Sequence, residues 1–285
     1  MDGRTAEKAA EKYLEDNNLL HLPVDPIAIA EKNGIIVEAK PASNAGVSGM
    51  LIKYGDIFGI AYATHINNEG FQRYSIAHEL GHYFLSGHPE SLFPEDGIHE
   101  SKAGFLSGNK YEREADHYAA GLLMPKSLFK REIDRRKTGY DAINILANKC
   151  KTSLTATAIR YTQFTAEPMA VILSEGSKID WCFMSDELKE IGQLDWPRKG
   201  QTLPSNTVTF QFNIKQENID QCKKEDGNSN FIDWFGGKRD FEIEEEAVGL
   251  GNYRKTLTIL TVTENLEEME EQDELEESWT PRFKR

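Results

Sequence analysis

The chain has 285 residues, a length that predicts one large domain or two smaller ones, each with its own hydrophobic core. No uninterrupted apolar run approaches the roughly 20 residues that a membrane-spanning helix needs, and the N-terminal sequence lacks the apolar stretch of a signal peptide. Three widely spaced cysteines without a CxxC pair indicate neither a disulfide framework nor a cysteine zinc site. We therefore expect a soluble, cytoplasmic protein without a membrane partner.

The net charge of -14 is concentrated in the second part of the chain. Residues 1–163 carry 19 Lys/Arg and 21 Asp/Glu, whereas the remaining residues carry 14 and 26. Much of this excess lies in residues 264–277, which predict a solvated acidic tail, with a partner-binding segment as the alternative. Because phosphate binding depends on Lys and Arg, the charge argues against direct nucleic-acid binding.

Before residue 70 the sequence predicts short scaffold helices and a hairpin. Asp25 is suited to cap a helix, Pro26 to occupy its first position and Gly34 to follow its end. Gly55-Asp56 is a dipeptide suited to a tight turn between two strands. The expected elements are helices at 4–18 and 25–34, a strand at 35–38, and hairpin strands at 50–54 and 57–63.

The next predicted helix carries a motif with metal-ligand spacing. From Gly70 apolar residues recur at helical spacing until Gly87, which predicts a helix that contains His78-Glu79-x-x-His82. Two histidines four residues apart lie on one helical face and can reach a single ion, with Glu79 beside them. The competing interpretation is an ordinary amphipathic helix with surface histidines.

A second helix, at 111–124, offers carboxylates beginning 30 residues after His82. A hydrolytic zinc site commonly takes three protein ligands and leaves one position for water, and Glu112 or Glu114 could complete the set. These two side chains point about 200° apart around a helix, so only one of them can readily face the ion. Complementing the helix dipole is the alternative role for this acidic cluster.

The rest of the chain predicts helices followed by a β-rich part. A loop at 87–109 precedes the second helix, and two short helices at 141–150 and 153–164 resemble a helix-turn-helix, although such pairs pack as core far more often than they read DNA. A domain boundary is expected near Pro168. Beyond it, strands are predicted at 168–174, 178–184, 207–214, 241–248 and 253–262.

The two segments RYSIAHELGHYFLSGH (73–88) and YEREADHYAAGLLMP (111–125) together resemble the ImmA/IrrE family of metallopeptidases. The resemblance covers about residues 5–165. It implies an α+β fold with a zincin-like metallopeptidase domain, built from a small antiparallel sheet and helices. The expected division is a peptidase domain at 1–137, a helical segment at 138–166, a β-rich domain at 167–263 and the acidic tail at 264–285.

The resemblance also implies roles for individual residues. His78, His82 and Glu112 would hold one Zn²⁺, with other divalent metals possible, and Glu79 would be the catalytic base. Asp116 would support a ligating histidine, and Glu114 remains an alternative ligand. The strand at 57–63 would offer an edge to an extended substrate, through Ile57, Gly59, Ala61 and Tyr62. The group that stabilises the oxyanion is left unassigned, with Tyr62, His65 and His88 nearby in sequence.

The function implied by the resemblance is a zinc-dependent endopeptidase that cleaves a cognate helix-turn-helix (XRE-type) repressor in stress, mobile-element or defence regulation. Water activated by the metal and by Glu79 would attack the peptide bond. Residues 168–285 would form a sensor or substrate-selecting module. The alternative is a non-catalytic binding or antitoxin-like protein that keeps the fold, and the intact Glu79 counts against it. A DNA-binding regulator is disfavoured because no basic stripe is present.

Overall fold

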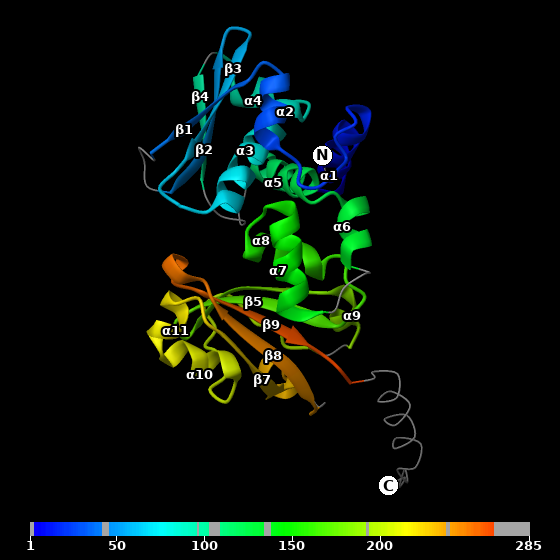
Figure 1. Cartoon of the computed structure of the whole chain (residues 1–285), viewed down its shortest axis with the longest axis vertical. Helices are drawn as coiled ribbons and strands as arrows, with labels where there is room; N and C mark the ends of the chain where they lie inside the picture. The colour runs from blue at the N-terminus through cyan, green and yellow to red at the C-terminus, as the bar shows by residue number, and fades with distance from the viewer. Residues whose placement is uncertain are drawn as a thin grey trace, which may run out of the picture. The chain divides into compact units, whose positions relative to one another are not determined.

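The computed structural model describes residues 3–41, 46–95, 97–102, 109–133, 138–191, 194–237 and 240–264. The chain divides into two compact units: unit 1 comprises residues 1–137 and 141–161, and unit 2 comprises residues 138–140 and 162–285 (Figure 1). The predicted acidic tail lies, apart from Glu264, outside the described residues. Within the described ranges no helix is long and apolar enough to cross a membrane.

Unit 1 contains a four-stranded mixed sheet. Its strands are β1 (Ile36–Lys40), β2 (Val47–Tyr54), β3 (Ile57–Ala63) and β4 (Gly97–Lys102), in the order β1-β3-β2-β4. β2 is antiparallel to both β3 and β4, but β1 is parallel to β3. The expectation of an antiparallel sheet is therefore wrong for β1. The tight β2–β3 hairpin, with Gly55 at φ 58°, returns the chain in the direction of β1.

The expectation that residues 57–63 offer a free edge is also wrong. β3 lies inside the sheet, and Gly59 pairs with Ile36 on one side and with Ile52 on the other. An interior strand has already committed its backbone N–H and C=O groups to two neighbours, so it cannot accept a third strand along this stretch. Among the described strands of this sheet, the edges are β1 and β4.

Helices of unit 1 pack against this sheet and one another. Asn68 caps α3 by accepting a hydrogen bond from the Phe71 N–H. α3 contacts β2 and β3, and α5 lies between α1 and α3 (Figure 1). A Cβ on Gly81 would lie 3.0 Å from the Ala115 Cα, so glycine allows α3 and α5 to approach closely. The helices are α1 (Gly3–Asp16), α2 (Pro26–Lys32), α3 (Glu69–Phe84), α4 (His88–Leu92), α5 (Lys110–Leu123), α6 (Lys126–Ile133), α7 (Gly139–Cys150) and α8 (Leu154–Thr162).

Unit 2 is built on a five-stranded antiparallel sheet in the order β6-β5-β9-β8-β7. Its strands are β5 (Met169–Glu175), β6 (Lys178–Met184), β7 (Lys224–Asn230), β8 (Glu242–Gly249) and β9 (Thr256–Thr261). Its helices are α9 (Asp186–Glu190), α10 (Val208–Ile214), α11 (Gln216–Asp220), α12 (Phe231–Phe235) and the 3₁₀ helix Gly251–Tyr253.

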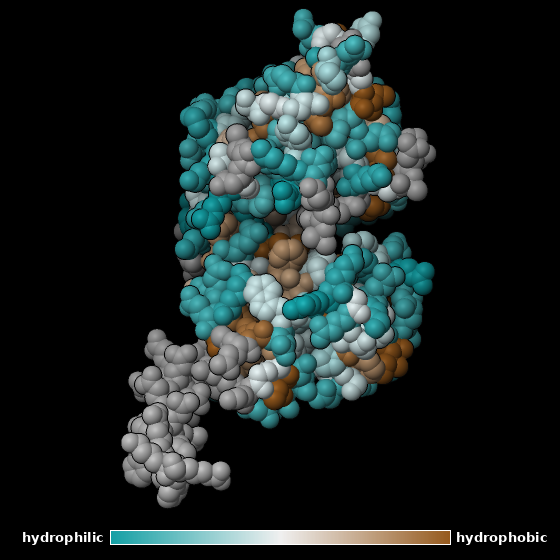
Figure 2. Space-filling view, turned by 180° about the vertical axis from the view of Figure 1, so that it is seen from behind, coloured by the Kyte–Doolittle hydropathy of each residue, from teal (hydrophilic) through white to brown (hydrophobic). Residues whose placement is uncertain are grey.

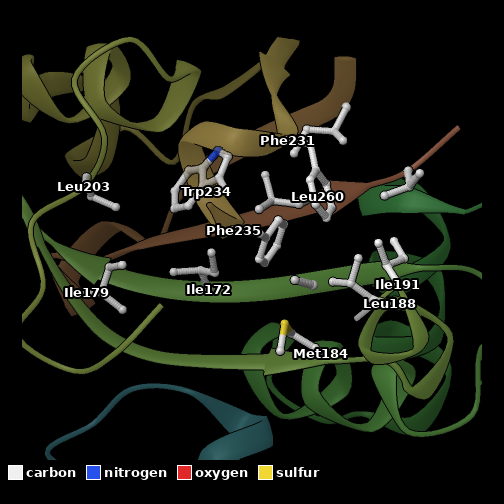
Figure 3. Packing of buried hydrophobic residues seen from close by; sticks show 13 residues of the cluster. Ile172, Ile179, Met184, Leu188, Ile191, Leu203, Phe231, Trp234, Phe235 and Leu260 are labelled. Carbon is white, nitrogen blue, oxygen red and sulfur yellow. The ribbon is translucent and has the colours of Figure 1, made fainter. Parts of the chain in front are cut away.

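Aromatic residues of α12 close the core of unit 2. Phe231, Trp234 and Phe235 are buried against Ile172 and Leu260 of the sheet, as Figure 3 shows. Unit 2 therefore has a hydrophobic core of its own, as the length of the chain predicts. On the outside, the face of each unit that is visible in Figure 2 is mainly hydrophilic and is interrupted by small apolar patches.

The predicted strand at 207–214 is wrong, because the segment forms α10. Thr207 caps this helix by accepting a hydrogen bond from the Phe210 N–H, and the buried Glu245 carboxylate accepts one from the Thr209 N–H at 2.6 Å. These contacts satisfy the first N–H groups of the helix and override an alternating apolar pattern. β4 and β7 were not predicted, because their polar sequences lack such a pattern.

Candidate metal centre

α3 and α5 bring three metal-ligand side chains together. His78 and His82 lie one turn apart on α3, and Glu112 lies in the first turn of α5. The Nε2 atoms of His78 and His82 are 3.1 Å apart. Glu112 Oε2 is 3.2 Å from His78 Nε2, and Glu112 Oε1 is 3.4 Å from His82 Nε2. Among the described residues, these three form the group whose possible ligand atoms lie close enough together to hold one metal ion, all within 4.8 Å of one another.

The chemistry and spacing of these atoms fit a zinc ion. Zinc bonds of about 2.0–2.1 Å in tetrahedral geometry separate neighbouring ligand atoms by roughly 3.3 Å. The observed separations of 3.1, 3.2 and 3.4 Å match this value. Burial lowers the pKa of His82 to about 3, so its imidazole is neutral and has a lone pair to offer at neutral pH.

Glu79 is a buried carboxylate next to these ligands. Its side chain is fully buried, and neither oxygen has a hydrogen-bond partner in the described part of the chain. Burial raises the pKa of Glu79 to about 7, against the opposing charge of His78. An unpaired buried carboxylate is costly unless a cation compensates it, so this orphaned group also fits a metal ion nearby.

His78 makes its second contact with a carboxylate on α5. His78 Nδ1 is 2.9 Å from Asp116 Oδ1, and the Tyr74 hydroxyl donates a hydrogen bond to the same oxygen at 2.9 Å. Burial would lower the pKa of His78, but its hydrogen bonds to Asp116 and Glu112 raise it to about 10. The sequence interpretation did not single out Tyr74, although it lies four residues before His78 on the same helical face.

The structure separates the two glutamates that the sequence left as alternatives. Glu112 faces both His78 and His82, and it also accepts a hydrogen bond at 3.0 Å from His99 Nε2 on β4. Burial would raise the pKa of Glu112, but the three histidines hold it well below its usual range. Glu114 is turned away from the ligands and contacts His88 Nε2 at 3.0 Å.

The strand register places the expected substrate-binding residues on both faces of the sheet. Tyr62 pairs with Gly49 across the strands, and the register of β2 with β4 places Ser101 and His99 on the same face of the sheet as this pair. A Cβ on Gly49 would lie 2.6 Å from Glu79 Oε1, so this face is turned toward the site. Because side chains alternate along a strand, the remaining expected residues point to the opposite face: Ile57, Gly59 and Ala61.

Comparisons with known proteins support the architecture. No curated protein matches the chain. The solved structure of a Mycobacterium tuberculosis transcriptional regulator matches with a TM-score of 0.54 and 13% sequence identity, over 90% of this chain and 76% of that chain. At this identity the likeness shows the fold alone. The model of the IrrE N-terminal-like domain, the Peptidase_M78 family, matches residues 30–162, which include His78, His82 and Glu112. Residues 30–162 therefore form an IrrE N-terminal-like domain, which confirms the resemblance to the ImmA/IrrE family.

Proposed function

We propose that the protein is a zinc-dependent endopeptidase. Membership of the Peptidase_M78 family indicates a metal-dependent, metallopeptidase-type function. The observation that carries the proposal is the convergence of His78, His82 and Glu112 next to the buried, unpartnered carboxylate of Glu79. A structural zinc site would be closed by four protein ligands, whereas three ligands and an adjacent acid–base group are typical of a hydrolytic site.

A zinc ion held by His78, His82 and Glu112 would supply Lewis acidity and lower the pKa of water. Glu79 then has the role of the base that takes a proton from the attacking water and returns it to the leaving amine. Asp116 accepts a hydrogen bond from Nδ1 of His78, so this nitrogen keeps its proton and a bound metal ion would replace the proton on Nε2. Tyr74, on the same helix as His78, donates a hydrogen bond to Asp116 on α5 and holds that carboxylate in place.

The proposed substrate is a specific protein, a helix-turn-helix transcriptional repressor, in stress, mobile-element or defence regulation. Two considerations support it: the ImmA/IrrE resemblance, and the description of the structural neighbour as a transcriptional regulator. Direct nucleic-acid binding is not part of the proposal, because the chain carries a net charge of -14.

The test is cleavage of candidate repressors by the full chain, followed by intact-mass measurement of both proteins. Glu79→Gln should keep the zinc content of the wild type but reduce the cleavage rate by at least about 100-fold, because it removes the proton acceptor. Glu90→Gln is the matched control, since Glu90 is an exposed glutamate on the neighbouring helix α4. This variant should cleave at the wild-type rate.

Two results would count against the proposal. Cleavage by Glu79→Gln at the wild-type rate would show that the proposed mechanism is wrong. A wild-type chain that binds zinc and a repressor tightly, yet leaves the repressor intact, would indicate the non-catalytic binding protein instead.

A further inference from the structure

His82 has a second partner on the side of its ring that faces away from the other ligands. Its Nδ1 atom is 3.1 Å from Nδ1 of His88, and Nε2 of His88 is 3.0 Å from Glu114 Oε2. Both histidine side chains are fully buried, and the Glu114 side chain is 6% exposed. The three residues therefore form a continuous chain of hydrogen bonds that starts at a metal ligand and ends at a carboxylate.

The direction of these hydrogen bonds follows from the position of His82. Its Nε2 atom faces His78 and Glu112, so this nitrogen must keep its lone pair for an ion. A neutral imidazole carries one proton, which then lies on Nδ1 and is donated to Nδ1 of His88. His88 in turn carries its own proton on Nε2 and donates it to Glu114. One tautomer of each ring satisfies every contact.

The surroundings hold His88 in this orientation. Its ring lies edge-on to Tyr111, with ring centroids 4.9 Å apart, and the Tyr111 hydroxyl is 2.9 Å from Ser91 Oγ on the same helix as His88. Lys110 Nζ lies 3.8 Å from Glu114 Oε1 and favours the charged carboxylate. The ring is thus packed on one side and hydrogen-bonded at both nitrogens.

We propose that His88 and Glu114 are positioning residues that orient His82 for metal binding. They do for His82 what Asp116 does for His78, with one imidazole inserted between the ligand and the carboxylate. A carboxylate at the end of such a chain fixes the ligand's tautomer and increases its basicity. This inference rests on the proposed metallopeptidase function, and it gives Glu114 a role other than that of a ligand.

The experiment measures the zinc dissociation constant of the full chain by competition with a chelator. His88→Phe keeps a flat ring against Tyr111 but removes both nitrogens, and it should weaken zinc binding by about 10- to 100-fold. His88→Gln retains an acceptor and a donor and should recover most of that loss. Glu114→Gln should also weaken binding, and the double variant His88→Phe/Glu114→Gln should bind zinc no more weakly than His88→Phe alone.

His117→Phe is the matched control. His117 lies on α5 and contacts a glutamate at the same 3.0 Å, but that residue is Glu7 of α1 and not part of the metal centre. This variant should bind zinc like the wild type. The visible absorption spectrum of the cobalt-substituted protein gives a second measurement, since a reoriented ligand alters the cobalt bands. It should change in His88→Phe and stay unchanged in His117→Phe.

The outcomes separate this inference from the proposed function. If wild type binds zinc and cleaves its substrate, but His88→Phe has the same zinc affinity and cobalt spectrum, then the positioning role is wrong and the function stands. A purely structural role for His88 would lower the melting temperature of the metal-free protein without changing either measurement. If His88→Phe does not fold, Glu114→Gln decides: unchanged zinc affinity would overturn the proposal. A wild-type chain that binds no zinc would overturn both.

Discussion

At the scale of single residues, the site depends on a glycine that the helical motif does not contain. Gly49 on β2 lies against the Glu79 carboxylate, and a Cβ there would meet Oε1 at 2.6 Å. The backbone of Gly49 is not left-handed, so the glycine is required for space and not for conformation. Glu79 is therefore positioned from the sheet as well as from its own helix.

We predict that Gly49→Ala slows cleavage but leaves zinc binding nearly unchanged. The added methyl group must displace the Glu79 carboxylate, and a displacement near 1 Å costs roughly 100-fold in rate. Zinc affinity should remain within a few-fold of wild type, because the ligands themselves are untouched. Gly97→Ala on β4 is the control, since a Cβ there meets nothing within 4 Å. Wild-type cleavage rates in Gly49→Ala would contradict the positioning of Glu79 by β2.

At the scale of helices and strands, the sequence predicted elements with local signals and missed those that depend on distant partners. Asp25 caps α2 through the Ile27 and Ala28 N–H groups, a contact within a few residues that the sequence reveals. β4 is a polar strand that exists by pairing with β2, far away in the sequence. Because β4 was read as a loop, its His99 and the contact with Glu112 could not be foreseen.

The choice of the third ligand shows the same limit. Helical geometry predicted that Glu112 and Glu114 face in different directions, and they do. Geometry alone did not say which of them faces the histidines, because that depends on how α5 packs against α3. The resemblance to the ImmA/IrrE family implied Glu112 as the third ligand, and the structure places this residue beside His78 and His82.

The Glu7 carboxylate joins three helices of unit 1, and its contacts predict that the stability of the protein depends on pH. Glu7 of α1 accepts a hydrogen bond at 2.8 Å from the buried Arg160 of α8 and contacts His117 of α5 at 3.0 Å. Burial would raise the pKa of Glu7, but these two partners lower it below its usual value. A carboxyl group with a lowered folded pKa stabilises the protein above its unfolded pKa of 4.5, and this stabilisation is lost as the pH falls through the folded pKa.

Glu7→Gln should therefore lower the free energy of unfolding by about 2 kcal/mol at pH 7, because Arg160 loses a charged partner. The difference from wild type should shrink as the pH falls below 4.5, where Glu7 of the unfolded state takes up a proton, and it should disappear once the pH is below the lowered pKa of folded Glu7. Urea denaturation at pH 7 and at pH 4 measures both effects. Glu15→Gln, an exposed change on the same helix, should stay within about 0.5 kcal/mol of wild type. A deficit that is equal at both pH values would exclude this linkage.

At the scale of the whole molecule, each unit has its own sheet and its own core, whereas the residues of the candidate metal centre all belong to unit 1. Unit 2 depends on Glu245, a fully buried carboxylate on β8. It accepts hydrogen bonds from the Thr209 N–H at 2.6 Å, from the Trp234 Nε1–H at 3.2 Å and from the Ser229 hydroxyl. This one side chain of β8 is hydrogen-bonded to α10, to α12 and to the neighbouring strand β7.

We predict that the two units unfold in separate transitions that respond to different changes. Zinc at about 100 times its dissociation constant should stabilise unit 1 by about 2.7 kcal/mol and raise the midpoint of one transition, because a ligand stabilises the unit that binds it. Glu245→Ala leaves buried donors unpaired and should destabilise unit 2 by at least about 3 kcal/mol, lowering the other midpoint. Scanning calorimetry of the full chain, with and without zinc, measures both shifts. The control is the zinc-induced shift in Glu245→Ala, which should equal that of wild type. One transition that moves with both changes would show that the two cores unfold as a single cooperative unit.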